Sequence, residues 1–230
     1  MADSNSVDVY LEIGSKRTFA GAVEWPGWSR SGPSENEAVT LLAEYGRRYA
    51  DVLGKAGIRV AVPPDASGFV IGERVVGNAT TDFGAPAIPP SADLQPIDDP
   101  GVRRLSRILE AVWAEFDRVA AGAAGVMLRT GPRGGGRDLH KMVEHVIGAE
   151  EAYLNALGAR APKAGPDLAV RWSELRPVEL VAIAARARGE APPNPSQTKK
   201  LWPPSYFVRR AAWHALDHLW EIEDRAVSGE

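Results

Sequence analysis

RRAAWHALDHLWEIEDR, at residues 209–225, is the stretch that decides the fold of the C-terminal part of this chain. Its apolar residues recur three and four positions apart, which is the period of an amphipathic helix. One face of that helix carries two histidines with small and apolar neighbours: Ala211, His214, Ala215, His218 and Ile222. The alanines leave space beside the imidazoles, and a buried face with polar groups and gaps is expected to hold water or a ligand.

Three stretches upstream repeat apolar residues with the same helical period. They lie at residues 99–119, 137–157 and 177–189, and the third of them begins with a proline and ends with a glycine. Four amphipathic helices in succession pack most economically as a four-helix bundle, whose cofactor sites are built from inward-pointing side chains. The fold expected for residues 99–230 is therefore an all-α four-helix bundle.

The N-terminal part of the chain mixes strand and helix signals. Residues 1–82 are predicted to form a small α+β domain with the order β-β-α-β-β, and Ser34 begins a capping-box sequence at the start of its helix. Residues 83–98 are rich in proline and polar residues without periodicity, which is typical of a linker. The strands are expected at residues 8–12, 17–25, 58–62 and 68–76, and the helix at residues 34–53.

Composition excludes several classes of function. The net charge is -3 and basic residues are interspersed with acidic ones, so nucleic-acid binding is not expected. The sequence shows neither a secretion signal nor an apolar run of roughly 18 residues, so we expect a cytoplasmic protein without a membrane segment. A small molecule is the expected partner, and a homodimer remains an open alternative. Because the chain has no cysteine, a bound metal would need nitrogen and oxygen ligands.

The four histidines are grouped in a way that suggests a metal site. His214 and His218 are four residues apart, so on a helix they lie about 40° apart with Cβ atoms roughly 6 Å apart. His145 lies at the inner edge of the apolar stripe of its own helix, at a comparable depth. His140 lies far from that stripe and is expected to face solvent. Three imidazoles on one divalent ion leave a position for water or substrate, as in catalytic zinc sites.

Three further side chains on the last helix are candidates for supporting roles. Asp217 and Glu221 each follow a histidine by three residues, so their carboxylates are in place to orient imidazole N–H groups. Arg210 lies one turn before His214 on the same face, where a guanidinium is suited to an anionic substrate group. No residue is singled out as directly catalytic.

The stretches HVIGAEEAYL (residues 145–154) and RRAAWHALDHLWEIEDR resemble the second and fourth helices of the DinB/YfiT-like metalloenzyme superfamily. The resemblance implies a DinB-like four-helix bundle whose metal ligands are His145, His214 and His218. Some members of that superfamily are metal-dependent transferases or isomerases that act with low-molecular-weight thiols such as mycothiol or bacillithiol. The resemblance therefore implies a reaction of this kind. The N-terminal stretch TFAGAVEWPGWSRSGPSENEA is similar to a HicB-type module, which implies partner contact.

Two hypotheses of different classes follow. The first is a metal-dependent enzyme, a transferase or hydrolase, that holds zinc, nickel or iron and performs nucleophilic chemistry, with thiol transfer as the leading reaction. The second is a non-catalytic interaction protein with a DinB scaffold and a partner-binding N-terminal module. An isolated pair of histidines four residues apart is more often part of a packed core than a metal site, so His145 is what favours the first hypothesis.

Overall fold

The computed structural model describes residues 6–130, 136–163, 165–192 and 201–226. The chain divides into two compact units, Met1–Gln95 and Pro96–Glu230. The first combines a sheet with helices, and the second is helical. Among the described residues, none of the helices has the length and apolarity that crossing a bilayer requires.

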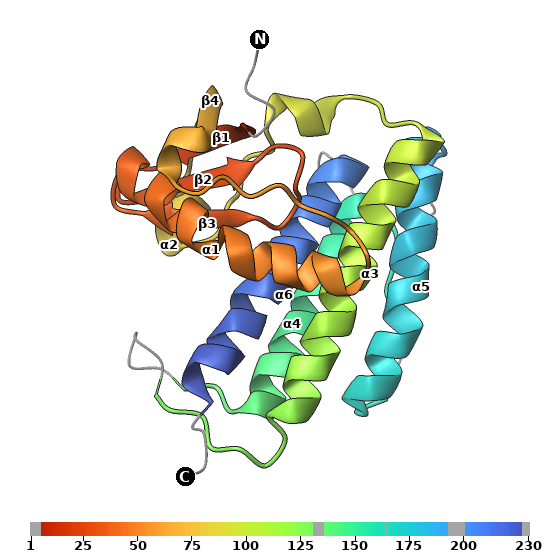
Figure 1. The fold of residues 1–230 in the computed structure, drawn as a ribbon. Coiled ribbons are helices and arrows are strands. Elements are labelled where there is room, and N and C mark those ends of the chain that lie inside the picture. The colour runs from red at the N-terminus through yellow and green to blue at the C-terminus, as the bar shows by residue number, and fades with distance from the viewer. Residues whose placement is uncertain (1–5, 131–135, 164, 193–200, 227–230) are drawn as a thin grey trace. The chain divides into compact units, whose positions relative to one another are not determined.

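The first unit contains a four-stranded sheet with the order β3-β2-β1-β4 (Figure 1). Strand β1 pairs antiparallel with β2 and parallel with β4, and β2 pairs antiparallel with β3. Gly14 donates its N–H to the carbonyl of Arg17 in the turn between β1 and β2. The regular elements are β1 Val7–Ile13, β2 Thr18–Ala22, β3 Ser29–Gly32, α1 Glu35–Lys55, η1 Ala66–Gly68, β4 Phe69–Val76, α2 Ala79–Phe83 and η2 Ser91–Leu94.

Helix α1 packs on β2 and β3 through a core centred on two aromatic rings. Trp28 stacks on Tyr49 with ring centroids 5.5 Å apart, and its indole donates a hydrogen bond to the carbonyl of Leu42. A glycine lets the helix approach this core: a Cβ at Gly46 would lie 2.6 Å from Val62 Cγ1 and 2.7 Å from Trp28 Cζ2. The absence of a side chain at Gly46 therefore fixes the distance between the helix and the sheet.

Two expectations about this unit are wrong. The strand predicted at residues 58–62 does not form, and Val62 instead packs beside α1, just before Pro63 and Pro64, which have no N–H to donate to a sheet. The sheet gains its fourth strand from β3, which precedes the helix, so the strand and α-helix order is β-β-β-α-β-α. Strand β3 has the sequence SRSG, which contains no residue with a strong strand preference, and it forms by pairing with β2.

The segment at residues 83–98 is largely part of the first unit, which extends to Gln95. The N–H groups of Ala87 and Ile88 donate to the carboxylate of Glu12 at 2.9–3.1 Å. Glu12 is fully buried on β1, and a buried carboxylate requires such donors. Ala87 and Ile88, which lie between Pro86 and Pro89 in this segment, therefore provide backbone donors for a buried acid.

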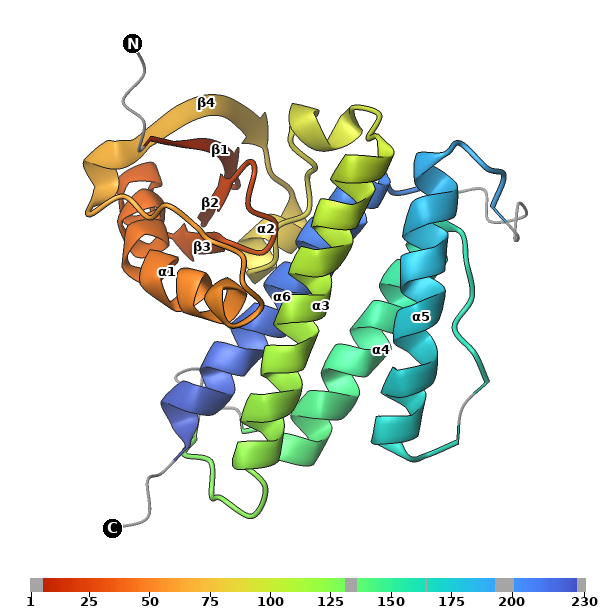
Figure 2. The same cartoon turned by 45° about the vertical axis from the view of Figure 1, so that its right-hand side comes forward.

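The described residues of the second unit form four long helices that pack together (Figure 2). Helix α3 contacts α5 and α6, and α4 contacts α5 and α6. Asp138 caps α4 by accepting a hydrogen bond from the N–H of Lys141, and Pro203 and Pro204 begin α6. The helices are α3 Asp99–Gly122, α4 Leu139–Leu157, α5 Leu168–Ala187 and α6 Pro204–Arg225.

Helix α5 begins nine residues earlier than predicted, at Leu168 instead of Pro177. Asp167 caps it by accepting hydrogen bonds from the N–H groups of Ala169 and Val170. Pro177 therefore lies inside the helix, although a proline is preferred in the first turn. The additional turns add Trp172 and Leu175 to the core.

Two fully buried carboxyl groups lie on neighbouring helices of this unit, Glu150 on α4 and Glu179 on α5. The Trp113 indole donates to Glu150 Oε1 at 2.9 Å, whereas Glu150 Oε2 and both oxygens of Glu179 have no hydrogen-bond partner among the described residues. Burial raises the pKa of Glu150 to about 7, and it raises the pKa of Glu179 well above its ordinary value. Burial therefore shifts both carboxyls toward the protonated form.

Candidate metal centre

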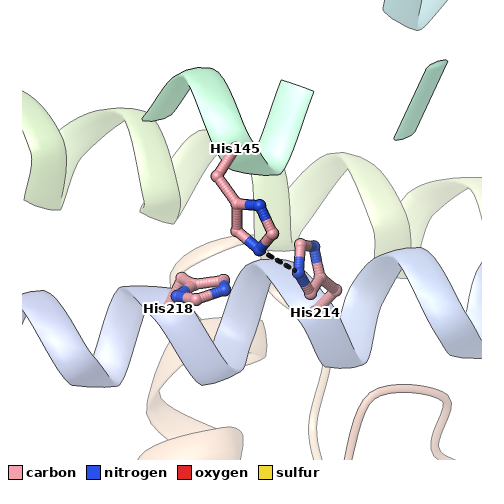
Figure 3. A group of neighbouring side chains, drawn as sticks. All are labelled: His145, His214 and His218. Carbon is pink, nitrogen blue, oxygen red and sulfur yellow. Dashed lines mark hydrogen bonds between the residues drawn. The ribbon is translucent and has the colours of Figure 1, made fainter. Parts of the chain in front are cut away.

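Helices α4 and α6 bring three imidazoles to one point (Figure 3). His145 comes from α4, and His214 and His218 come from successive turns of α6. One ring nitrogen from each histidine lies within 4.8 Å of the other two, and the Nε2 atoms of His145 and His214 are 3.3 Å apart. The three side chains that the sequence selected are thus within reach of a common ion.

The immediate surroundings favour neutral imidazoles. Burial lowers the pKa of His145 to about 4, and it lowers the pKa of His214 well below its ordinary value, with nearby positive charge adding to both effects. His214 Nδ1 is buried and has no hydrogen-bond partner within the described part of the chain. A neutral imidazole offers a lone pair, which is what a metal ion binds.

Glu221 orients one of the three rings. Its Oε2 accepts a hydrogen bond from His218 Nδ1 at 3.0 Å, and its Oε1 accepts one from Arg225 at 2.7 Å. These two hydrogen bonds lower the pKa of Glu221 to about 2, and the hydrogen bond from His218 has the larger effect. A carboxylate on Nδ1 holds the proton there and leaves Nε2 as the free ligand atom. The spacing of three residues therefore gives Glu221 the position expected of it.

Arg225 anchors this carboxylate to the connection between α3 and α4. Its Nε donates to the carbonyl of Arg129 at 2.7 Å, and its Nη2 donates to the carbonyl of Arg137 at 3.1 Å. The N–H of Arg129 in turn donates to the carbonyl of Arg225, and Leu128 forms a β-bridge with Ala226. Sequence analysis did not identify Arg225, because an arginine near the end of a helix is common for electrostatic reasons alone.

Asp217 does not orient His214 through Nδ1, since that nitrogen has no partner among the described residues.

Arg210 lies in a buried, mainly aromatic environment. It is 7% exposed, and its Nε and Nη1 are buried without an acceptor in the described chain. Its Cζ lies 5.1 Å from the ring centroids of both Tyr153 and Trp213. Cation–π contacts stabilise such a group by roughly 0.5–2 kcal/mol each, whereas burying an unpaired charge costs several kcal/mol.

Tyr153 on α4 contacts both Arg210 and His214. It was not identified from the sequence as a functional residue. Its ring centroid is 5.9 Å from that of His214 and 5.2 Å from that of Trp202. Burial raises its pKa, so its hydroxyl remains protonated and able to donate. The sequence does place Tyr153 two turns after His145 on the same helix. This spacing is not specific, because an aromatic residue on a buried helical stripe is usually part of the core.

The fourth histidine lies apart from this group. His140 is exposed in the first turn of α4, as expected, and lines a separate cavity of about 700 Å³ beside α3 and α5. The cavity is lined mainly by apolar side chains such as Val143 and Trp172 and by none of the three clustered histidines. His140 is therefore a natural control for the three clustered histidines.

Comparisons with family models, with curated proteins and with solved structures gave no match to this chain.

Proposed function

We propose that the second unit is a DinB-like four-helix bundle that binds one divalent transition metal ion through His145, His214 and His218. The observation that carries the proposal is the approach of three ring nitrogens, from two helices, to within 4.8 Å of one another. Zinc, nickel and iron all accept a set of three imidazoles, and the ion taken up depends on availability. The resemblance of the two histidine-bearing stretches to DinB/YfiT-like proteins supports the same ligand set.

The chemistry of the donor set fits a metal ion. The Nε2 atoms of His145 and His214 face each other at 3.3 Å, and burial keeps both rings neutral. Glu221 holds the third ring by its Nδ1, so that Nε2 is free. A packed core without an ion would gain little from three polar rings, one of which has a buried nitrogen that no described residue contacts by a hydrogen bond.

A bound ion would supply Lewis acidity and lower the pKa of a coordinated water or thiol. The residues of the chain then have distinct tasks. Three imidazole ligands would leave room for a small molecule, Glu221 keeps the His218 ring fixed, and Tyr153 offers a protonated hydroxyl beside His214. We propose transfer from or to a low-molecular-weight thiol as the reaction, with a small molecule as the second substrate.

Metal content is the first test. Untagged protein, analysed by mass spectrometry of its elements, is expected to carry about one zinc, nickel or iron per chain. The triple variant His145→Ala, His214→Ala, His218→Ala is expected to carry none, whereas His140→Ala is expected to keep the full content. An equal metal content in the triple variant and in the wild-type protein contradicts the proposal.

Catalysis is a separate test. The metal-loaded protein is incubated with mycothiol, bacillithiol or glutathione and with electrophiles of several classes, and loss of free thiol is followed. Turnover that disappears in the triple variant supports the transferase. Full metal content without turnover, together with a protein that stably co-purifies through residues 1–95, favours the rival role as an interaction protein.

A further inference from the structure

We propose that Arg210, together with Tyr153, binds an oxyanion group of the small-molecule substrate beside the three histidines. The inference rests on the proposed function, because it names the class of substrate that the same site would accept. It predicts a small organic molecule with a carboxylate or phosphate group, rather than a neutral one.

The first reason is the state of the guanidinium. Arg210 is 7% exposed, its Nε and Nη1 are fully buried, and no described residue accepts a hydrogen bond from either. The faces of the Tyr153 and Trp213 rings, each 5.1 Å from Cζ, compensate only part of the lost hydration. A buried cation normally has a carboxylate or carbonyl partner, so an arginine without one is suited to an anion that arrives from outside.

The second reason is position. Arg210 and His214 are one turn apart on the same face of α6, which corresponds to roughly 6 Å between Cβ atoms. The Tyr153 ring contacts both, with its centroid 5.9 Å from that of His214 and 5.1 Å from Arg210 Cζ. A ligand at the histidines therefore has a cation and a hydroxyl donor within one helical turn.

The third reason is the charge of the surroundings. Glu221, the carboxylate beside the histidines, is held by His218 at 3.0 Å and by Arg225 at 2.7 Å. It lies about three turns after Arg210 along α6, so it is not available to neutralise that guanidinium. With a divalent ion bound, the site would carry additional positive charge and would favour an anion further.

Binding of simple oxyanions tests the inference without requiring turnover. Isothermal titration calorimetry is performed with succinate and with inorganic phosphate on the full-length protein, both metal-free and loaded with one zinc per chain. Wild-type protein is expected to bind one anion per chain, and the preferred anion identifies the oxyanion as carboxylate or phosphate. Arg210→Met is expected to weaken that binding at least tenfold in both forms. Arg103→Met, which removes an exposed arginine of α3, is the control and is expected to change the affinity for the anion less than twofold.

The outcomes separate this inference from the metal proposal. Anion affinity within twofold of wild type in Arg210→Met, or no binding of either anion by the wild-type protein, overturns the role of Arg210. A protein that takes up neither zinc, nickel nor iron contradicts the proposed function, and the metal-free titrations still test Arg210. Anion binding that requires zinc but not Arg210 overturns the inference and leaves the metal site standing.

A second variant covers the case in which Arg210→Met does not fold. Arg210→Lys keeps the charge but loses the planar fork of donors, so oxyanion binding is expected to weaken at least threefold with the circular dichroism spectrum unchanged. Unchanged affinity in a folded Arg210→Lys variant would mean that the guanidinium makes no directed contact with the anion, which contradicts the inference. Tyr153→Phe is expected to weaken binding by a smaller factor.

Discussion

Replacing the buried carboxyl of Glu150 by an amide should stabilise the protein at neutral and alkaline pH. Glu150 is fully buried, and its pKa is raised from 4.5 to about 7 because burial disfavours the charged form. The protonated Glu150 carboxyl therefore makes its full contribution to the free energy of unfolding below pH 4.5, and this contribution is lost as the pH rises through 7. Glu150→Gln removes this loss and keeps an oxygen to accept the hydrogen bond of Trp113 at 2.9 Å.

The size of the effect follows from the shift. An increase of the pKa from 4.5 to about 7 corresponds to roughly 3 kcal/mol above pH 7, of which about 2–3 kcal/mol develops between pH 5 and pH 8. Urea unfolding followed by circular dichroism at these two pH values measures the difference between Glu150→Gln and wild type. The difference is expected to be small at pH 5 and to favour the variant at pH 8.

Glu144→Gln is the matched control, because Glu144 is exposed on the same helix. Its unfolding free energy is expected to remain within about 0.5 kcal/mol of wild type at both pH values. If the advantage of Glu150→Gln is the same at pH 5 as at pH 8, Glu150 does not change its charge between them, and the account of a protonated carboxyl in the core is refuted.

Three other perturbations have defined outcomes. Glu221→Gln is expected to weaken zinc binding by about 10- to 100-fold in a chelator competition, because the ring that it orients loses a charge-assisted hydrogen bond; unchanged affinity would contradict this role. Because burial lowers the pKa of His145 to about 4 and also lowers that of His214, zinc affinity is expected to fall much less from pH 7.5 to pH 5.5 than the roughly thousandfold loss of three imidazoles with ordinary pKa. Gly46→Ala is expected to destabilise the first unit by roughly 1–3 kcal/mol in thermal unfolding, while Gly54→Ala, which has open space, is expected to stabilise it slightly; equal effects would contradict the close packing.

Sequence periodicity identified the long helices but not all of their limits. Helix α6 was predictable because its apolar face continues from end to end, whereas the start of α5 was missed because Pro177 was interpreted as its first residue. Strand β3 has no strand-forming residues and depends on its partner β2, so only tertiary pairing defines it. Residues 58–62 show the opposite case, since they have strand-forming residues but no partner strand.

The site was predictable to the extent that it follows helical spacing. The intervals between His214 and His218, and between His218 and Glu221, are local, and the structure brings these side chains to the positions expected. The approach of His145 depends on how α4 packs on α6, which a helical wheel indicates but does not measure. Tyr153 could not be distinguished from a core residue, because only its tertiary neighbours show what it contacts. Whether an ion binds remains a prediction.

The contacts of Arg225 have a consequence for how this protein can vary. The guanidinium reaches the carbonyls of Arg129 and Arg137, which belong to the main chain, and through Glu221 it holds His218. Because both acceptors are main-chain carbonyls, these two hydrogen bonds do not depend on which side chains residues 129 and 137 carry. An insertion that displaces either carbonyl is therefore expected to move Arg225 and, through Glu221, the ring of His218, on a helix far away in the sequence.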